Sequence, residues 1–556
     1  MRPTGASQWT DHAMTLPAAR GRRTGAQTIV PPDRLPSRNI YSRRARLFSA
    51  DETASWNERN AALLRLYGLR VAHVAVLPLE PPLPGRGRRG ALQTEHKDRL
   101  LLTAMMGALA VSLSGRGDLL AVPPAARDKV KRELKETNDR NSTAAMSEAL
   151  HALCDASPGT RLSIAIGEGA RKKPGEKGGN PTLYSGQVIG GGGPVGHAEA
   201  VTAGGARQGA YQLAVDTVEG TTKSTLFDSS CGTLLFATEA PIAVVPDMYF
   251  DKCQLRGVDG VTVADPLERI VEAVRQARGT REINLFSLDR SRHPIERLVD
   301  LGACMRTDTD GDAYPVIAAG LAWGVYPDNL RPLDGVAGDI GGAAETIASA
   351  AGASFLGVRS TARFCTGKVK RWEERYDLDD QEREEIRSRG LEPDRVYSID
   401  DLAPGVAGAD GAFLAAAITD NSHIPGLDAV YVGGNFASVS ALFVGSAGTA
   451  ELYDVAFAFE KPYDQTVETM TPVLTRLLLL PPDGIPDAVR KALADPRLAR
   501  RLLHEVATSY YTHLQEERGP GGAAMRLDME SAERAESEAS LAVLRALLEQ
   551  SPGWFL

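Results

Sequence analysis

The stretch from Tyr211 to Phe227, YQLAVDTVEGTTKSTLF, decides how this chain is interpreted. Its apolar beginning predicts a buried strand that ends at Asp216. Glu219 follows in a turn that also holds Gly220 and Thr221. Two carboxylates so placed can share one divalent cation, and a glycine lets the backbone N–H groups approach an anion. The stretch therefore predicts a phosphate and metal site, although an ordinary acidic turn after a strand fits the same residues.

Two further stretches place a carboxylate in a similar setting. LSIAIGEG at 162–169 is an apolar strand that ends at Glu168 between glycines, and GDIGGAAET at 338–346 carries Glu345 after a glycine pair. The chain has no zinc-type spacing of Cys and His. Three carboxylate stretches in such a chain point to a hard cation that is held by oxygen ligands.

Six short motifs identify a family that the chain resembles. They are IGEG at 166–169, LYSG at 183–186, AVDTVEGT at 214–221, PDMY at 246–249, DGD at 310–312 and IGGAAE at 340–345. In these residues and their order, the sequence resembles the class II fructose-1,6-bisphosphatases of bacteria, within the lithium-sensitive sugar phosphatase superfamily. The resemblance covers roughly residues 100–460, and the set of motifs is specific although each one alone is not.

The resemblance implies a fold and a reaction. The fold would be α/β, a layered αβαβα sandwich like that of the sugar phosphatases. The reaction would be metal-dependent hydrolysis of the 1-phosphate of fructose 1,6-bisphosphate, which gives fructose 6-phosphate and phosphate. Mn²⁺ or Mg²⁺ would be the cofactor, and the catalytic residues would be Glu219 and Thr221, with Thr221 orienting the attacking water. The implied metal ligands are Glu168, Asp216, Glu219 and Glu345.

The same resemblance implies which residues bind the sugar bisphosphate substrate. They are Gly220, Thr221, Tyr249, Arg290, Ser291, Arg292, Asp310, Gly311, Asp312 and Gly342. Arg290 and Arg292 suit a second phosphate, because a guanidinium group binds phosphate oxygens in a planar fork. Asp310 and Asp312 suit sugar hydroxyls, although an ordinary acidic turn is an equal interpretation of these two residues.

The chain departs from the family pattern in two places. A metal-binding Asp closely follows GRGD in the family, but here 119–138 are inserted and the matching position falls near Ser142. Asp139 or Asp118 would replace that ligand, or the site would lack it. The loop after IGEG carries RKK at 171–173, which is either a solvated loop or an altered electrostatic wall beside the phosphate site.

Two other motifs favour chemistry that we do not expect here. GxGxxG at 191–196 resembles a dinucleotide site, but it contains Pro194 and is followed by further glycines, so we interpret it as a loop. CTGKVKR at 365–371 matches the CxxxxxR of cysteine-dependent phosphatases. Only one glycine lies within that match and bulky residues flank it, so we predict that Cys365 is not catalytic.

Composition limits the remaining possibilities. Hydrophobic residues make up 43% and charged residues 24% of the 556 positions, as in globular proteins. The net charge of −8 argues against nucleic acid as a partner, because phosphate backbones attract basic surfaces. No apolar run is long enough for a membrane helix, so we expect no membrane partner. Five scattered cysteines, none in a CxxC pair, predict reduced thiols and a cytoplasmic location.

The organisation along the chain is predicted in four parts. They are a disordered basic tail at 1–55, a first α/β part of the phosphatase core at 56–330, a second at 331–462 and a helical C-terminal extension at 463–556. We expect the extension to serve self-association, which would make the protein a homo-oligomer.

Two alternative functions remain open from the sequence. One is a phosphatase for another sugar or cyclitol phosphate, such as sedoheptulose 1,7-bisphosphate or an inositol phosphate. The other is a noncatalytic scaffold with this fold, which the missing acid near Ser142 favours. Against the scaffold, the chain retains Glu168, Asp216, Glu219, Thr221 and Glu345 together.

Overall fold

The computed structural model describes the central part of the chain. The described residues are 45–79, 92, 94–114, 122–169, 182–183, 185–190, 210–226, 228–322, 325–326, 331–374, 377–433 and 436–459. Several predictions lie outside these residues: most of the basic tail, Asp118, RKK at 171–173, GxGxxG at 191–196 and the helical C-terminal extension. Within the described ranges, no helix combines the length and the apolar character that a membrane span requires.

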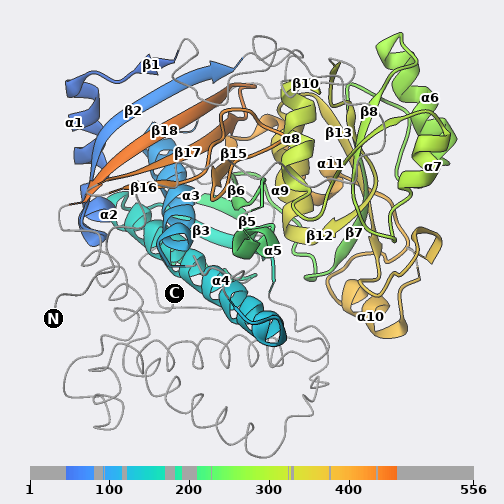
Figure 1. Ribbon diagram of the computed structural model, residues 1–556, viewed down its shortest axis with the longest axis horizontal. Helices are drawn as coiled ribbons and strands as arrows, with labels where there is room; N and C mark the ends of the chain where they lie inside the picture. The colour runs from blue at the N-terminus through green and yellow to red at the C-terminus, as the bar shows by residue number, and fades with distance from the viewer. Residues whose placement is uncertain are drawn as a thin grey trace, which may run out of the picture.

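Two mixed sheets organise the described residues (Figure 1). The first sheet runs in the order β1 (Arg46–Leu47), β2 (Leu69–Leu79), β18 (Ala450–Phe459), β17 (Phe436–Gly445), β15 (Gly411–Ala417), β6 (Gly232–Thr238), β5 (Ala210–Glu219), β3 (Arg161–Gly167) and β4 (Val188–Gly190), with β16 (Tyr431–Gly433) paired to β17. The second runs in the order β14 (Tyr397–Ser398), β13 (Val358–Cys365), β7 (Tyr249–Arg256), β12 (Gly335–Gly342), β8 (Asn284–Leu288) and β9 (Cys304–Asp308). A separate short pair joins β10 (Val325–Tyr326) to β11 (Arg331–Pro332).

Helices lie on both faces of each sheet, and three large apolar cores fill the spaces between them. Near the N-terminus are α1 (Ala50–Arg59), α2 (Ala61–Leu66), α3 (Thr94–Ser114) and α4 (Pro124–Ala156). The remaining helices are α5 (Thr221–Leu226), α6 (Leu267–Arg278), α7 (Ile295–Asp300), α8 (Ala313–Leu321), α9 (Ala343–Ser354), α10 (Asp380–Ser388) and α11 (Ile399–Leu402). α3 and α4 share a core with one face of the first sheet, α8 and α9 fill the space between the sheets, and α6 covers the outer face of the second. The predicted α/β class is confirmed, and the layers run helix, sheet, helix, sheet, helix.

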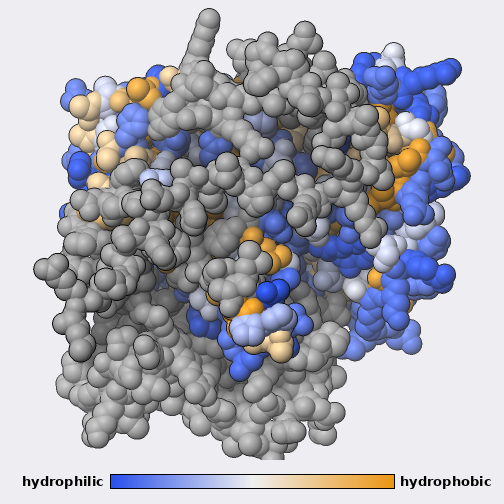
Figure 2. Space-filling model, in the orientation of Figure 1, coloured by the Kyte–Doolittle hydropathy of each residue, from blue (hydrophilic) through white to orange (hydrophobic). Residues whose placement is uncertain are grey.

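Strand β5 shows why the first sheet is buried on both faces. Leu213 and Val215 contribute to the core beneath α3 and α4, whereas Ala214 contributes to the core beside α9, because successive strand residues point to opposite faces. Burial of a leucine or valine side chain of this kind contributes about 1.5–3 kcal/mol. α9 approaches closely because its residues are small: a Cβ on Gly352 would lie 2.4 Å from Phe413 Cβ. The outer helices α6, α7 and α10 present a largely hydrophilic surface (Figure 2).

The structure corrects one expectation about the elements and defines two others. The predicted tail at 1–55 extends too far, because β1 and α1 lie within it and Ser49 caps α1 through a capping box with Glu52. α4 begins at Pro124, so most of the inserted segment 119–138 is helical, because much of it consists of strong helix formers. In the charged stretch after β13, a 3₁₀ turn at Trp372–Glu374 and α10 are separate elements.

The two α/β parts that the sequence predicts share both sheets. β15, β17 and β18 come from the predicted second part and join the first sheet between β2 and β6. β12 comes from the same part and lies in the second sheet between β7 and β8. Strands from both parts therefore meet where the site residues lie.

Candidate metal and phosphate site

The parallel pairing of β3 and β5 places Glu168 beside Asp216. The register aligns Gly167 with Val215, and the Glu168 N–H donates to the Val215 carbonyl at 2.9 Å. Glu168 and Asp216 are therefore the next aligned residues on neighbouring strands. The two apolar stretches that the sequence analysis selected are adjacent in space, and each delivers its carboxylate at the same end of the sheet.

A β-bulge brings Glu219 to the same face as Asp216. Asp216 pairs with Leu234 and Glu219 with Gly232 on β6, so the β5 segment contains one residue more than its partner. Without the bulge, residues three apart on a strand would point to opposite faces. The Asp216 carboxylate also accepts the Val218 N–H at 3.0 Å, which supports the bulged backbone.

Glu345 enters the site from the first turn of α9, and two glycines make room for the other carboxylates. Its side chain accepts the Gly342 N–H at the helix start. A Cβ on Gly342 would lie 2.3 Å from Glu168 Oε2, and a Cβ on Gly341 would lie 2.4 Å from Asp312 Oδ2. A Cβ at either position would displace a carboxylate, because the carboxylates occupy the space that it would need.

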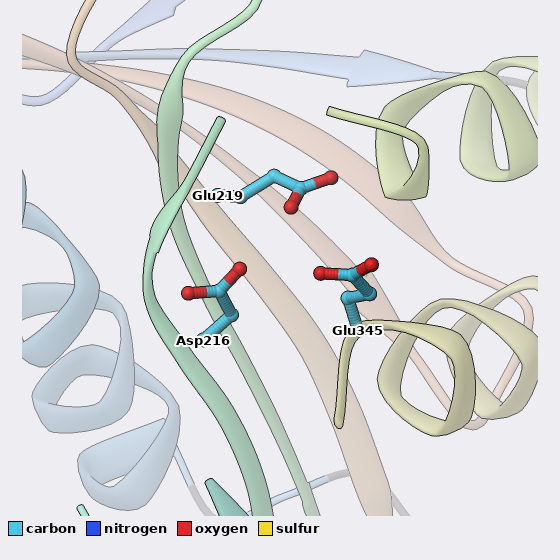
Figure 3. A group of neighbouring side chains, drawn as sticks. All are labelled: Asp216, Glu219 and Glu345. Carbon is cyan, nitrogen blue, oxygen red and sulfur yellow. The ribbon is translucent and has the colours of Figure 1, made fainter. Parts of the chain in front are cut away.

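Asp216, Glu219 and Glu345 form a compact group of oxygen ligands. One carboxylate oxygen of each lies within 4.8 Å of the others, and the three side chains turn toward a common space (Figure 3). Burial raises the pKa of all three carboxyl groups well above the ordinary range, and the charge of Glu168 adds to the rise for Asp216. A divalent cation would offset this repulsion, and a ligand set made only of carboxylates fits Mg²⁺ or Mn²⁺.

The position near Ser142, where the family resemblance implies a further metal-binding carboxylate, lies on α4. Ser142 is buried and its hydroxyl donates to the Thr217 carbonyl at 2.6 Å, so it packs against the bulge of β5. Asp139 lies one turn earlier, is also buried, and its charge contributes to the raised pKa of Asp216. Of the two replacements that the sequence leaves open, Asp139 lies close enough to act on the cluster, whereas Asp118 lies outside the described residues.

The turn after β5 has the backbone shape that the sequence predicts. Gly220 has φ +75°, a conformation that favours glycine, and a Cβ there would lie 3.3 Å from the Ser230 carbonyl. The Thr221 hydroxyl donates to the Val218 carbonyl at 3.0 Å. Glu219 is held from the other side, because its Oε1 accepts the Ala313 N–H at 2.9 Å. The carboxylate and the turn are thus fixed relative to each other.

Comparisons with known proteins place the chain in a family. Residues 119–454 match the family described as bacterial fructose-1,6-bisphosphatase, glpX-encoded. The chain belongs to this family. It is 29% identical over 282 residues to the "Fructose-1,6-bisphosphatase 2 class 2" of Escherichia coli (strain K12), an alignment that covers 48% of this chain and 83% of that protein. The protein is therefore a divergent member of the class II fructose-1,6-bisphosphatases, and this family is metal-dependent.

The residues that this member of the bisphosphatase family is predicted to use for substrate binding form two groups: Arg290 contacts the DGD turn, and Arg292 contacts Tyr249. Arg290 donates to Asp310 at 2.7 Å and to the Thr309 carbonyl at 3.1 Å, so it is joined to the DGD turn. The Arg292 guanidinium carbon lies 5.4 Å from the centre of the Tyr249 ring, within cation–π range. Gly311 has φ +80°, which gives the turn its shape, and a Cβ there would lie 3.8 Å from Glu219 Oε1.

The sequence analysis missed Lys252, whose ammonium group lies beside the carboxylate cluster. Its Nζ is 2.8 Å from Asp312 Oδ2 and 3.5 Å from Asp339 Oδ2, and Asp339 in turn contacts His293 at 3.1 Å. Burial would lower the pKa of Lys252, but Asp312 and Asp339 outweigh it and hold that pKa above its ordinary value. The local signal was weak, because YFDKCQLR at 249–256 carries four polar or charged residues, and the charged partners that a buried lysine needs come from other segments.

A second missed cation, Lys223, follows the phosphate turn. It is buried on α5 and pairs with Asp308 at 2.5 Å, and His423 Nε2 lies 3.4 Å from the same carboxylate. This pair ties the turn after β5 to β9 of the second sheet. Nothing in its local sequence distinguishes Lys223 from a solvated lysine, since its partners lie far along the chain.

The cysteines behave as the sequence predicts. All five thiols are unbridged, and Cys365 is buried on β13. Burial raises the pKa of Cys365, which disfavours the thiolate that nucleophilic attack requires. Arg371, the last residue of the CxxxxxR match, pairs with Glu374 on the surface. Thiol chemistry of the cysteine-phosphatase type is therefore not supported.

Proposed function

We propose that this protein removes the 1-phosphate of fructose 1,6-bisphosphate and releases fructose 6-phosphate and inorganic phosphate. The observation that carries the proposal is the convergence of Asp216, Glu219 and Glu345 beside the turn at Gly220 and Thr221. Family membership supplies the substrate class. The printed name of the Escherichia coli relative agrees with this choice.

The proposed cofactor is Mn²⁺ or Mg²⁺. Glu168, Asp216, Glu219 and Glu345 would hold it, and Asp139 would contribute from α4. When bound, such a cation supplies positive charge to the phosphoryl oxygens and activates water. The backbone contacts of Glu168, Asp216 and Glu219 hold these groups in place before the substrate arrives.

Thr221 would orient the nucleophile. Its hydroxyl hydrogen is directed to the Val218 carbonyl, so its oxygen is left to accept a hydrogen bond. An attacking water that donates to Thr221 Oγ1 would turn a lone pair toward phosphorus, as in-line displacement requires. The glycine turn at Gly220 would let backbone N–H groups approach the phosphoryl oxygens, where negative charge develops.

The remaining substrate residues would bind the sugar and its second phosphate. Arg290 and Arg292 would bind that phosphate, and Ser291 lies between them. Tyr249 would flank the sugar, with Asp310 and Asp312 near its hydroxyls and Gly342 giving room for the reacting group. The ion pair with Asp310 would place the Arg290 guanidinium before the substrate arrives.

The test is phosphate release from a panel of sugar phosphates with Mn²⁺ or Mg²⁺ and with EDTA. The panel contains fructose 1,6-bisphosphate, sedoheptulose 1,7-bisphosphate and an inositol phosphate. We expect metal-dependent release, best from fructose 1,6-bisphosphate, that Glu219→Gln lowers at least about a hundredfold and Cys365→Ser leaves intact. If another compound of the panel is hydrolysed best, that compound would replace fructose 1,6-bisphosphate as the proposed substrate. No release from any compound, with no metal binding, would favour the noncatalytic scaffold.

A further inference from the structure

The loop that follows β13 passes directly beside the residues proposed for the second phosphate. β13 pairs with β7, and the register places Cys365 opposite Tyr249. A Cβ on Gly367 would lie 2.5 Å from Cε2 of the Tyr249 ring. The Ser291 hydroxyl donates to the Lys370 carbonyl at 3.1 Å. The backbone of Lys370 is therefore hydrogen-bonded to the residue between Arg290 and Arg292.

Several contacts hold this loop in place. The Thr366 hydroxyl donates to Glu382 Oε1 at 3.1 Å, and Lys368 pairs with Asp379. Val369 is buried with Ile340 and Cys365, and Tyr249 packs against the same small core. The position of Lys370 is thus set by the packing of its neighbours, and its own side chain is free to extend.

Lys370 differs from the other basic residues of the loop in its charge environment. Lys368 is neutralised by Asp379, and Arg371 by Glu374. Lys370 is exposed, and no carboxylate of the described residues pairs with it. Nearby, the Arg292 Nε is buried and has no acceptor within the described ranges. Among the residues that the structure describes, Arg292 Nε therefore lacks an acceptor, and Lys370 carries an unpaired charge on a loop whose backbone contacts Ser291.

We propose that Lys370 is a specificity-determining residue that contributes a third cation to the second-phosphate subsite of Arg290 and Arg292. The inference rests on the function proposed above and deepens it. A lysine carries its charge on a flexible four-carbon side chain, so it can follow a phosphate that the two arginines hold. The result would be selection for sugar bisphosphates over sugar monophosphates. The CTGKVKR stretch would then serve binding through its second lysine.

The test compares kcat/KM for fructose 1,6-bisphosphate with kcat/KM for fructose 1-phosphate, which lacks the second phosphate. In Lys370→Ala we expect this ratio to fall about tenfold, as for loss of one charge-assisted contact at a partly exposed site. Lys370→Arg keeps the positive charge and should retain most of the wild-type ratio. Lys368→Ala is the matched control, because its ammonium group is already paired, and should keep the wild-type ratio. An unchanged ratio in Lys370→Ala, or an equal change in Lys368→Ala, would overturn the proposal.

A binding measurement separates failure of this inference from failure of the proposed function. Fructose 6-phosphate carries only the second phosphate, and its dissociation constant can be measured by calorimetry on the full chain. We expect about tenfold weaker binding in Lys370→Ala than in wild type. If wild type hydrolyses no bisphosphate, the proposed function fails and this difference alone decides the role of Lys370. Equal binding by the two proteins, or none by wild type, would refute it.

Discussion

Substitution of Gly342 by alanine tests whether metal binding depends on the position of the Glu168 carboxylate. Gly342 precedes α9 with φ −65° and ψ 159°, an extended conformation that alanine adopts without strain. The new Cβ would lie 2.3 Å from Glu168 Oε2 and 2.6 Å from Glu168 Cδ. The carboxylate must therefore retreat by at least about 0.7 Å before it reaches the 3.0 Å below which Cβ contacts are essentially never found.

That displacement is large on the scale of metal coordination. Ligand distances in a functional site are held within about 0.2 Å of their ideal values, so Glu168 would no longer reach a cation placed by the other ligands. Loss of a supporting contact alone costs about 10–100-fold in metal affinity. We therefore expect Gly342→Ala to bind Mn²⁺ at least about tenfold more weakly. The fold should lose no more than about 1 kcal/mol, the cost of alanine in place of glycine before a helix.

Titration of free Mn²⁺ by electron paramagnetic resonance measures this affinity in wild type and three variants. Gly408→Ala is the neutral control, because nothing lies within 4 Å of the added Cβ. Gly352→Ala disturbs the same helix, since its Cβ would lie 2.4 Å from Phe413 Cβ, but it leaves the carboxylates alone. Wild-type Mn²⁺ affinity in Gly342→Ala, or an equal loss in Gly352→Ala, would refute the reasoning.

Three further outcomes are expected. Lys252→Met should lower the free energy of unfolding, measured by urea denaturation in EDTA, by about 3–5 kcal/mol, because Asp312 and Asp339 would be left buried without the lysine ammonium group. A decrease in this free energy no larger than that caused by Lys368→Met, at an exposed lysine, would contradict the prediction. Asp139→Asn should weaken Mn²⁺ binding about 10–100-fold, whereas Ser142→Ala on the same helix should weaken it little. Equal Mn²⁺ affinities of wild type and both variants, measured by calorimetry, would exclude Asp139 as a ligand. Mn²⁺ affinity should fall as the pH is lowered and binding should release protons, because the raised pKa values of Asp216, Glu219 and Glu345 favour protonation of these groups in the metal-free protein. Identical binding heats in buffers of different ionisation enthalpy would show that no proton is released.

The carboxylates could be found from sequence because each is marked locally. Asp216, Glu219 and Glu345 stand at the ends of apolar stretches or after glycine pairs, and such patterns are legible without tertiary information. The bulge that turns Glu219 to the face of Asp216 depends on pairing with β6, which no local pattern encodes. The reason for glycine at position 342 could not be predicted from the sequence either, because the carboxylate that a Cβ would meet there belongs to Glu168.

The remaining parts of the site depend on contacts between distant segments. Lys252 lies on β7 but pairs with Asp312 before α8 and with Asp339 on β12, so its role follows from the second sheet as a whole. The prediction that Asp139 replaces the acid missing near Ser142 depends on how α4 packs against β5. A shift of one helical turn is enough to exchange these positions, and sequence alone does not determine it.

The central claim is that the chain holds a divalent cation between β5 and α9. Its most direct test is the unfolding temperature with and without Mn²⁺, measured in wild type and in a Glu219→Gln variant that retains the size of the side chain. A cation that binds only the folded protein raises this temperature. We expect a clear rise in wild type and little or none in Glu219→Gln. No rise in wild type, or an equal rise in both proteins, would contradict it.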